Sequence, residues 1–338
     1  MKLIVHAGPH KTGTTFIQDS FANNRSDLLK SGWAYPIAGT YGSTGHHHLA
    51  HNFVEYIEAD GADNRALRAE AQDIRENHLN MVLSAEGFCR WAPRKYIALA
   101  EVVGANSIEV IYTVRDPMTV FHSYWGEEVK QGFTASFADR FLESLCTPIT
   151  DRVLNPMQDI APLLRSPEID LHAVPYDELA RRDENLFLHL LSAVLRIKDV
   201  PPSTNSKANS SLPIELTELL RLANLIHGEG APRTSPDLRL AFMGTTSRDE
   251  RKSLTDLVRE DAARARRQIV VPADDIHTKR METILESRLD GYWTRPLAPE
   301  GLFPLLDRNL TYYDTFFLWQ TPSVRQAAEA IVNRCAAT

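Results

Sequence analysis

The chain has 338 residues, 43% of them hydrophobic and 24% charged, which is the composition of an ordinary globular protein with a sizeable core. The net charge of −7 argues against a protein that coats nucleic acid or an anionic membrane through bulk electrostatics. The three cysteines form no CxxC pair, and no apolar run approaches the roughly 18 residues of a membrane span. We therefore expect a cytoplasmic, soluble protein without a membrane-spanning segment.

The first half of the chain alternates short apolar runs with segments of helical character. The β-branched run over 3–7 predicts a buried strand, and the apolar spacing after it predicts a helix over 14–30 that stops near Gly32. A loop rich in Gly, Ser, Thr and His is expected over 37–48. The remaining expectations are strands at 80–84, 109–114 and 169–174 and helices at 66–77, 93–103 and 117–130.

This alternation predicts an α/β, three-layer fold with a central parallel sheet flanked by helices, and the glycine-spaced segment described below makes the expected fold P-loop-like. The carboxyl ends of parallel strands share one edge of a sheet, and ligands bind there. Three suggestive segments begin at such ends: 8–15, 84–86 and 115–123.

The pattern changes after Val200, where 201–206 is a turn-rich break. We expect a core domain over 1–200 and a mainly helical region over 201–338 that packs on it as a cap. The expected helices of this region are 213–226, 247–268, 278–288 and 323–335.

The segment after the first strand has the glycine spacing of a phosphate-binding loop. Gly8 and Gly13 are separated by four residues, and a helix is expected to begin directly afterwards. In a nucleoside-triphosphatase loop a lysine follows the second glycine, but here Thr14 does, and the lysine is Lys11 inside the loop. Loop amides and a helix N-terminus still favour a phosphate, although the displaced lysine indicates a different reaction.

The residues Lys-Thr-Gly-Thr-Thr at 11–15 resemble the 5′-phosphosulfate loop of the sulfotransferases that use 3′-phosphoadenosine-5′-phosphosulfate (PAPS). Together with His10 and Gln18, they are similar to a bacterial branch of that superfamily. The resemblance implies that the loop binds the donor through Pro9, His10, Lys11, Thr12, Gly13, Thr14 and Thr15.

A second motif supports the first. Val-Arg-Asp-Pro at 114–117, followed by Ser123, resembles the 3′-phosphate site of the family, in which an arginine and a serine eight positions later hold the phosphate. The arginine fork suits a phosphate, and Pro117 suits the first turn of a helix. Tyr176 lies in a segment similar to the family's Tyr-Glu-Asp-Leu, with the two acids interchanged, and the resemblance places it near the adenine. The resemblance extends over roughly 1–215.

Transfer to an alcohol needs a base and a positive charge at the leaving oxygen. Lys11 suits the second role, and the resemblance makes Glu86, just after a strand, the first candidate for the base. The histidines at 46–48 and 51 offer an alternative base; a metal site is not expected there, because neighbouring residues of a helix cannot all face one ion. We expect His47, His48 and Trp91 near the acceptor.

The resemblance implies a PAPS-dependent sulfotransferase that acts on a hydroxyl or amine without a metal. A P-loop small-molecule kinase, or a nucleotide-binding protein without catalysis, remains an alternative. The acceptor could be a small molecule, a lipid or a carbohydrate, and nucleic acid is not expected as a partner. The sequence does not indicate the oligomeric state.

Overall fold

The computed structural model describes residues 1–198, 200, 212–228, 236–303 and 306–336. The chain forms two compact units, each with its own core. Unit 1 comprises Met1–Pro117, Asn155–Asn209 and Ile276–Leu305, and unit 2 comprises Met118–Leu154, Ser210–Asp275 and Leu306–Thr338. The units alternate along the chain, whereas the sequence suggested one boundary near residue 200. The turn-rich break predicted at 201–206 lies outside the described residues.

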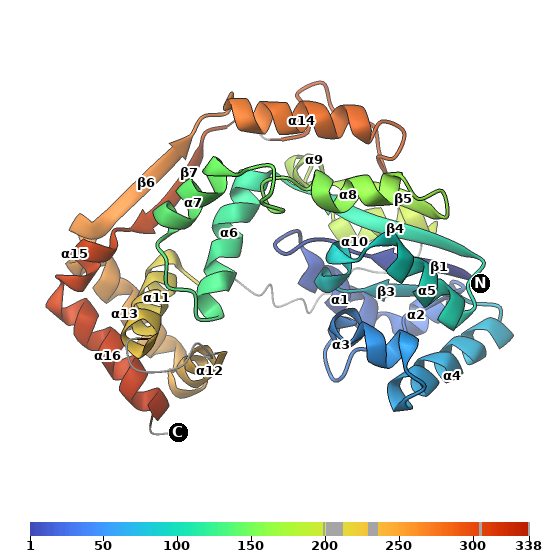
Figure 1. Ribbon diagram of the computed structural model, residues 1–338, viewed down its shortest axis with the longest axis horizontal. Coiled ribbons are helices and arrows are strands. Elements are labelled where there is room, and N and C mark those ends of the chain that lie inside the picture. Colours follow the sequence, from blue (N-terminus) through green and yellow to red (C-terminus); the bar gives the residue numbers. More distant parts are fainter. Residues whose placement is uncertain (199, 201–211, 229–235, 304–305, 337–338) are drawn as a thin grey trace. The chain divides into compact units, whose positions relative to one another are not determined.

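Unit 1 is an α/β unit built on a five-stranded sheet in which all neighbouring strands run parallel (Figure 1). The strand order is β2 (Trp33–Ala34), β3 (Asn80–Ser84), β1 (Lys2–His6), β4 (Ser107–Val114) and β5 (Ile169–Pro175). The four strands expected from apolar, β-branched runs are confirmed. The fifth, β2, has two residues, too few to produce a periodic pattern.

Helices cover both faces of this sheet, because successive side chains of each strand point to opposite sides. Leu3 and Val5 of β1 belong to one core, and Ile4 belongs to the other. The Leu3 face is covered by α4 (Ala62–Glu76), α5 (Pro93–Val103), α8 (Met157–Leu164) and α14 (Ile276–Arg288). The Ile4 face is covered by α1 (Thr14–Asn23), α2 (Arg25–Lys30), α9 (Tyr176–Arg181) and α10 (Leu186–Leu190).

The helix predicted over 14–30 is two helices. The break lies at Asn24, whose side-chain amide donates to the Ser20 carbonyl at 2.8 Å and stops the first helix there. The prediction of α5 is confirmed at both ends, with Pro93 in the first turn and Gly104 in the left-handed conformation after the last one.

Short helical turns occupy parts of the chain that the sequence left as loops. The segment predicted as loop over 37–48 ends in α3 (His47–His51), which the π-helical turn η1 (Val54–Glu58) follows. A 3-10 turn, η2 (Glu86–Arg90), comes directly after β3 and Ala85. These turns place His47 and Glu86 at the start of two short helices.

Unit 2 is mainly helical and also contains a two-stranded antiparallel sheet of β6 (Arg266–Val271) and β7 (Arg308–Tyr313). Its helices are α6 (Pro117–Lys130), α7 (Phe137–Cys146), α11 (Ile214–Gly228), α12 (Pro236–Thr245), α13 (Arg248–Asp261), α15 (Thr315–Trp319) and α16 (Pro322–Ala336). The helix predicted over 247–268 is wrong beyond Asp261, because β-branched residues from Ile269 onward favour the strand.

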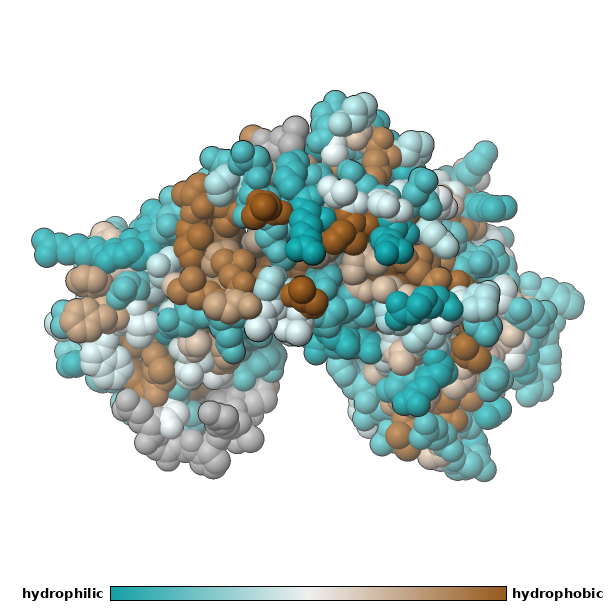
Figure 2. Space-filling view, turned by 45° about the horizontal axis from the view of Figure 1, so that its top comes forward, coloured by the Kyte–Doolittle hydropathy of each residue, from teal (hydrophilic) through white to brown (hydrophobic). Residues whose placement is uncertain are grey.

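One face of the molecule shows hydrophobic residues interspersed with hydrophilic ones (Figure 2). Several large apolar side chains are exposed, among them Leu142 and Ile149 in and after α7. Within the described segments, no helix has both the length and the apolar character needed to cross a bilayer.

Candidate functional site

The loop after β1 has a backbone conformation that few residue types adopt without strain. Lys11 has φ +67° and Gly13 has φ +81°, so two of its residues are left-handed within three positions. A Cβ on Gly8 would lie 3.0 Å from His6 Nε2 and 3.1 Å from Thr12 Oγ1, so this position accepts little beyond glycine. The Thr12 hydroxyl donates to the Pro9 carbonyl at 2.6 Å and closes the turn.

Gly13 is the N-cap residue of α1, and as a glycine it has no side chain that could cap the first turn of this helix. The amides of a helix N-terminus favour an anion when no side chain occupies them. The candidate loop residues differ in exposure: Thr12 and Thr14 are buried, His10 is exposed, and Pro9, Lys11, Gly13 and Thr15 are intermediate.

The carboxylate of Glu86 lies against this loop. The Thr14 hydroxyl donates to Glu86 Oε1. On the other oxygen, Gln18 Nε2 donates to Oε2 at 3.1 Å, and His47 Nδ1 lies 3.2 Å from the same atom. Glu86, predicted from its place after a strand, is therefore joined directly to the predicted phosphate-binding loop and to one of the predicted histidines.

Glu86 is 8% exposed, yet its carboxyl is held in the ionised form. Burial alone would raise the pKa of Glu86, but the hydrogen bond from Thr14, the nearby His47 and the hydrogen bond from Gln18 together lower it below its ordinary value. Gln18 is 2% exposed and was singled out in the sequence only as part of the motif. Its position one helical turn after Thr14 is the signal that could have placed it beside Glu86.

Two further histidines form a buried row behind Glu86. His6 Nδ1 lies 2.7 Å from Ser84 Oγ, and the Ser84 amide donates to His46 Nδ1 at 3.2 Å. Burial lowers the pKa of His6 to about 4 and that of His46 to about 3, so both rings are neutral at pH 7. His46 Nε2 then donates to the Pro36 carbonyl at 3.1 Å. These two rings position the end of β3.

Arg115 joins the second motif to the first. Its guanidinium Nη1 donates to the Lys11 carbonyl, and its Cζ lies 4.7 Å from the centre of the Tyr176 ring. Its Nε is buried and has no hydrogen-bond partner among the described residues. The structure therefore brings together Arg115, Lys11 and Tyr176, three of the predicted donor-binding residues.

Two buried carboxylates lie beside Arg115. The Asp116 amide donates to Asp177 Oδ2 at 2.6 Å, and the two residues are 1% and 9% exposed. Burial raises the pKa of Asp177 to about 6, although the hydrogen bond from Asp116 and the charge of Arg115 act in the opposite direction. No role was predicted for Asp177 from the sequence.

Ser123, the predicted partner of Arg115, lies on α6 in unit 2. There it lines a cavity of about 130 Å³ together with His122 and Thr217. The pairing of Ser123 with Arg115 at a phosphate stays a prediction.

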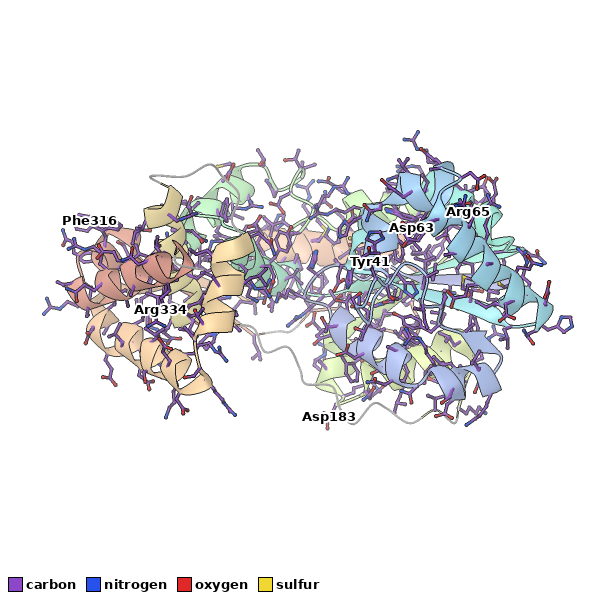
Figure 3. All side chains as sticks on the ribbon, turned by 90° about the horizontal axis from the view of Figure 1, so that it is seen from below. Tyr41, Asp63, Arg65, Asp183, Phe316 and Arg334 are labelled. Atoms are coloured by element: carbon purple, nitrogen blue, oxygen red, sulfur yellow. The ribbon has the colours of Figure 1, made fainter. Side chains whose placement is uncertain are left out.

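The other predicted acceptor residues lie near η1 and η2. His48 Nδ1 lies 3.0 Å from the Tyr56 hydroxyl, and the exposed ring of Tyr41 stacks on His48 with centroids 4.5 Å apart. Tyr41 is labelled in Figure 3. Trp91 is buried in the core, where its indole donates to the Ala50 carbonyl at 3.0 Å. His48 is thus partly accessible, whereas Trp91 packs behind the surface.

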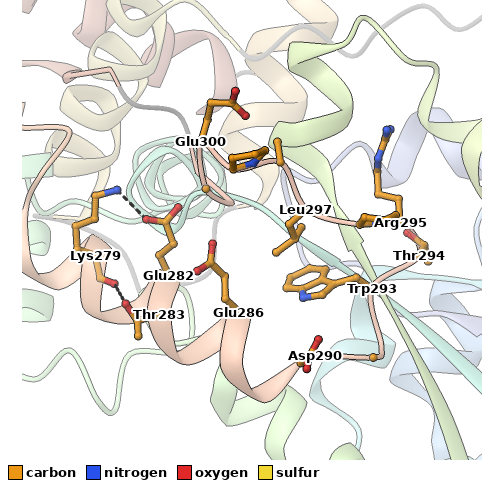
Figure 4. Close-up of a pocket in the computed structure, with 15 residues that line it drawn as sticks. Lys279, Glu282, Thr283, Glu286, Asp290, Trp293, Thr294, Arg295, Leu297 and Glu300 are labelled. Carbon is orange, nitrogen blue, oxygen red and sulfur yellow. Dashed lines mark hydrogen bonds and ion pairs between the residues drawn. The ribbon is translucent and has the colours of Figure 1, made fainter.

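A larger cavity of about 880 Å³ in unit 1 lies along α14 and the segment after it (Figure 4). Its lining includes Glu282, Glu286 and Trp293, and none of the motif residues borders it. In the part of the chain that the structure describes, no group of three His, Cys, Asp or Glu side chains could hold a metal ion.

No protein-family model and no curated protein sequence matches this chain. The chain is an α/β protein with a central parallel sheet, and its function has to be inferred from the site at the carboxyl edge of that sheet.

Proposed function

We propose that this chain is a PAPS-dependent sulfotransferase of a P-loop-like fold, which transfers a sulfuryl group to a hydroxyl or amine. One observation carries the proposal: the motif segments follow β1, β3 and β4, three adjacent strands, and they are in contact. Thr14 of the first segment bonds Glu86 of the second, and Arg115 of the third bonds Lys11 of the first.

The strand order favours nucleotide binding at this place. The chain passes from β3 on one side of β1 to β4 on its other side, so the ends of these strands border a topological switch point. In the proposal, the loop amides and the start of α1 bind the 5′-phosphosulfate. Arg115, whose buried Nε has no partner among the described residues, binds the 3′-phosphate, and the ring of Tyr176 lies near the adenine.

The chemistry that we propose needs only the side chains and backbone amides of this site. The acceptor oxygen attacks sulfur in line and loses its proton to the Glu86 carboxylate. Lys11 stabilises the charge that develops on the bridging phosphate oxygen as its bond to sulfur breaks. The proposal assigns no metal to the reaction, since Lys11 and the loop amides supply the positive charge. The acceptor is a small molecule, a lipid or a carbohydrate, and the reaction is placed in the cytoplasm.

The site offers less support for ATP chemistry. A P-loop kinase uses a lysine directly after the second glycine and a threonine hydroxyl on Mg²⁺. Here Thr14 occupies the first of these positions and Thr15 the second, so the lysine is missing at the place where a kinase needs it. A 3′-phosphate clamp also has no use in a kinase.

Calorimetric titration with 3′,5′-adenosine bisphosphate (PAP) tests the proposal. We expect binding in the micromolar range and weaker binding of 5′-AMP, because the second nucleotide lacks the 3′-phosphate. Arg115→Ala should reduce the difference between the two nucleotides. No binding of PAP at high micromolar concentration, or magnesium-dependent ATP turnover, would overturn the proposal.

A further inference from the structure

The Glu86 carboxylate is poorly suited to meet an acceptor hydroxyl directly. Three donors already face its two oxygens, and its side chain is only 10% exposed. The same donors lower its pKa, and a carboxylate with a low pKa is a weak proton acceptor at neutral pH. Its position at the phosphate loop nevertheless places it beside the proposed sulfuryl group.

His47 is the accessible member of this network. Its side chain is 38% exposed, and its Nδ1 lies 3.2 Å from Glu86 Oε2. Its Nε2 lies 3.2 Å from Gln18 Oε1. The Gln18 amide is oriented by the carboxylate, because Gln18 Nε2 donates to Glu86 and its oxygen must then face His47. Both ring nitrogens of His47 therefore face acceptors.

Such an environment matches the protonated imidazole. A neutral ring can donate from one nitrogen only, and then the lone pair of the other nitrogen faces the Gln18 oxygen. The protonated ring donates to Glu86 and to Gln18 at once. The arrangement is thus prepared for the charge that His47 would carry after it has taken a proton, as in other preorganised sites.

The neighbouring histidines do not share these features. His46 is fully buried, and its two nitrogens face the Ser84 amide and the Pro36 carbonyl. His48 contacts the Tyr56 hydroxyl and stacks on Tyr41. Among the described histidines, the contact with the Glu86 carboxylate is made by His47.

We infer that His47 is the catalytic residue that takes the proton of the acceptor, and that Glu86 and Gln18 are positioning residues that act through it. The inference rests on the proposed function and moves the proton acceptor from the Glu86 carboxylate to Nε2 of His47. The hydrogen-bonded network of His47, Glu86 and Gln18 then serves one step, the removal of the acceptor proton.

The acceptor hydroxyl replaces Gln18 Oε1 beside Nε2 of neutral His47 and donates its hydrogen bond to that nitrogen. As an oxygen lone pair forms the new bond to sulfur, the proton passes to Nε2 and the O–H electrons remain on the acceptor oxygen. The bond from sulfur to the bridging phosphate oxygen breaks, and its electron pair leaves with PAP. The ring, now charged, donates to Glu86 and, once the product has left, to Gln18.

Release of radiolabelled sulfate from PAPS tests this inference, with water as the probe acceptor. We expect His47→Ala to lower kcat by about 10²- to 10⁴-fold, which is the usual contribution of a general base. PAP affinity, measured by calorimetry, should stay within twofold. Added imidazole should restore part of the rate of His47→Ala, a response that a purely structural role would not produce. His78→Ala, at an exposed histidine that follows α4, is the matched control and should keep its rate.

Two substitutions separate the two candidate bases. Glu86→Gln should lower kcat only in part, because His47 remains to take the proton. His47→Gln should lower kcat as far as His47→Ala does, and equal thermal midpoints would show that the variant is folded.

Full activity of His47→Ala, or no rescue by imidazole, would overturn the inference and leave Glu86 as the base. A protein that binds PAP but releases no sulfate from PAPS would also contradict it. Absence of PAP binding in the unaltered protein would instead overturn the proposed function, and the inference with it.

Discussion

The Arg115 guanidinium donates a hydrogen bond to the backbone carbonyl of Lys11, 104 positions earlier in the chain. Lys11 has a left-handed backbone, which costs a non-glycine residue about 1–2 kcal/mol. The bond from Arg115 helps to hold this conformation, and the contact with the Tyr176 ring holds Arg115 in turn. The two segments that we predict to bind phosphate are therefore joined directly to each other.

Arg115→Lys should weaken PAP binding by about 10- to 100-fold, because an ammonium group replaces the planar fork that bonds Lys11 and faces the proposed phosphate. Tyr176→Phe is the control, since it keeps the ring under the guanidinium and should bind nearly normally. Calorimetry on both variants provides the comparison. Equal affinity of Arg115→Lys and the unaltered protein would contradict the proposed role of the fork.

Gly13→Ala should destabilise the protein more than Gly32→Ala. Both glycines have φ above +80°, so both variants carry the same backbone strain of about 1 kcal/mol. A Cβ on Gly13 would also lie 2.9 Å from Leu186 Cδ2, whereas a Cβ on Gly32 meets no described atom within 4 Å. Urea unfolding measures the difference, and equal losses in the two variants would show that Leu186 yields without cost.

Asp177→Asn should change how stability depends on pH. The pKa of Asp177 is raised to about 6 from an ordinary value of 3.8, so the protonated form is favoured in the folded protein. The Asp177 carboxyl therefore stabilises the folded protein fully below about pH 4. This contribution to the free energy of unfolding, on the order of 2–3 kcal/mol, is lost as the pH rises through 6.

Asparagine can still accept the bond from the Asp116 amide but cannot ionise. The variant should therefore gain stability relative to the unaltered protein between pH 4.5 and 7.5. Urea unfolding at several pH values measures this gain, and parallel curves for the two proteins would refute the assignment.

Glu218→Ala should destabilise unit 2 strongly. The side chains of Glu218 and Arg221 are 0% and 1% exposed, and they form an ion pair in which Arg221 Nε lies 2.7 Å from Glu218 Oε2. Glu218 also accepts a hydrogen bond from the Tyr313 amide at 2.8 Å. Removing one partner leaves a buried charge, which costs about 3–5 kcal/mol.

The exposed pair of Lys30 and Asp27, 2.8 Å apart, is the control. Lys30→Ala should change stability by less than about 1 kcal/mol, because solvent screens that pair. Thermal or urea unfolding measures both variants. A small loss in Glu218→Ala would mean that water reaches the guanidinium.

Local sequence signals predicted the parts of the fold that depend on local chemistry. Pro93 and Gly104 delimit α5, and the apolar run of β3 has the predicted ends. The helical turn that carries His47 and the strand that begins at Arg266 were missed or misassigned, because their conformations depend on contacts with distant segments. At the site, the sequence placed Lys11, Glu86 and Arg115 at one sheet edge. Their direct bonds depend on side-chain directions, which no spacing encodes.

The alternation of the two units along the chain has a consequence for synthesis. Met281, Leu285 and Leu289 belong to the core under the Leu3 face of the sheet, although the strands of that sheet are all made by residue 175. A ribosome that has finished every strand of unit 1 has still to make a hundred residues before α14 can cover them. Part of the apolar face of unit 1 is therefore exposed while these residues are synthesised. During that time a chaperone that holds incompletely folded chains would have a surface to bind.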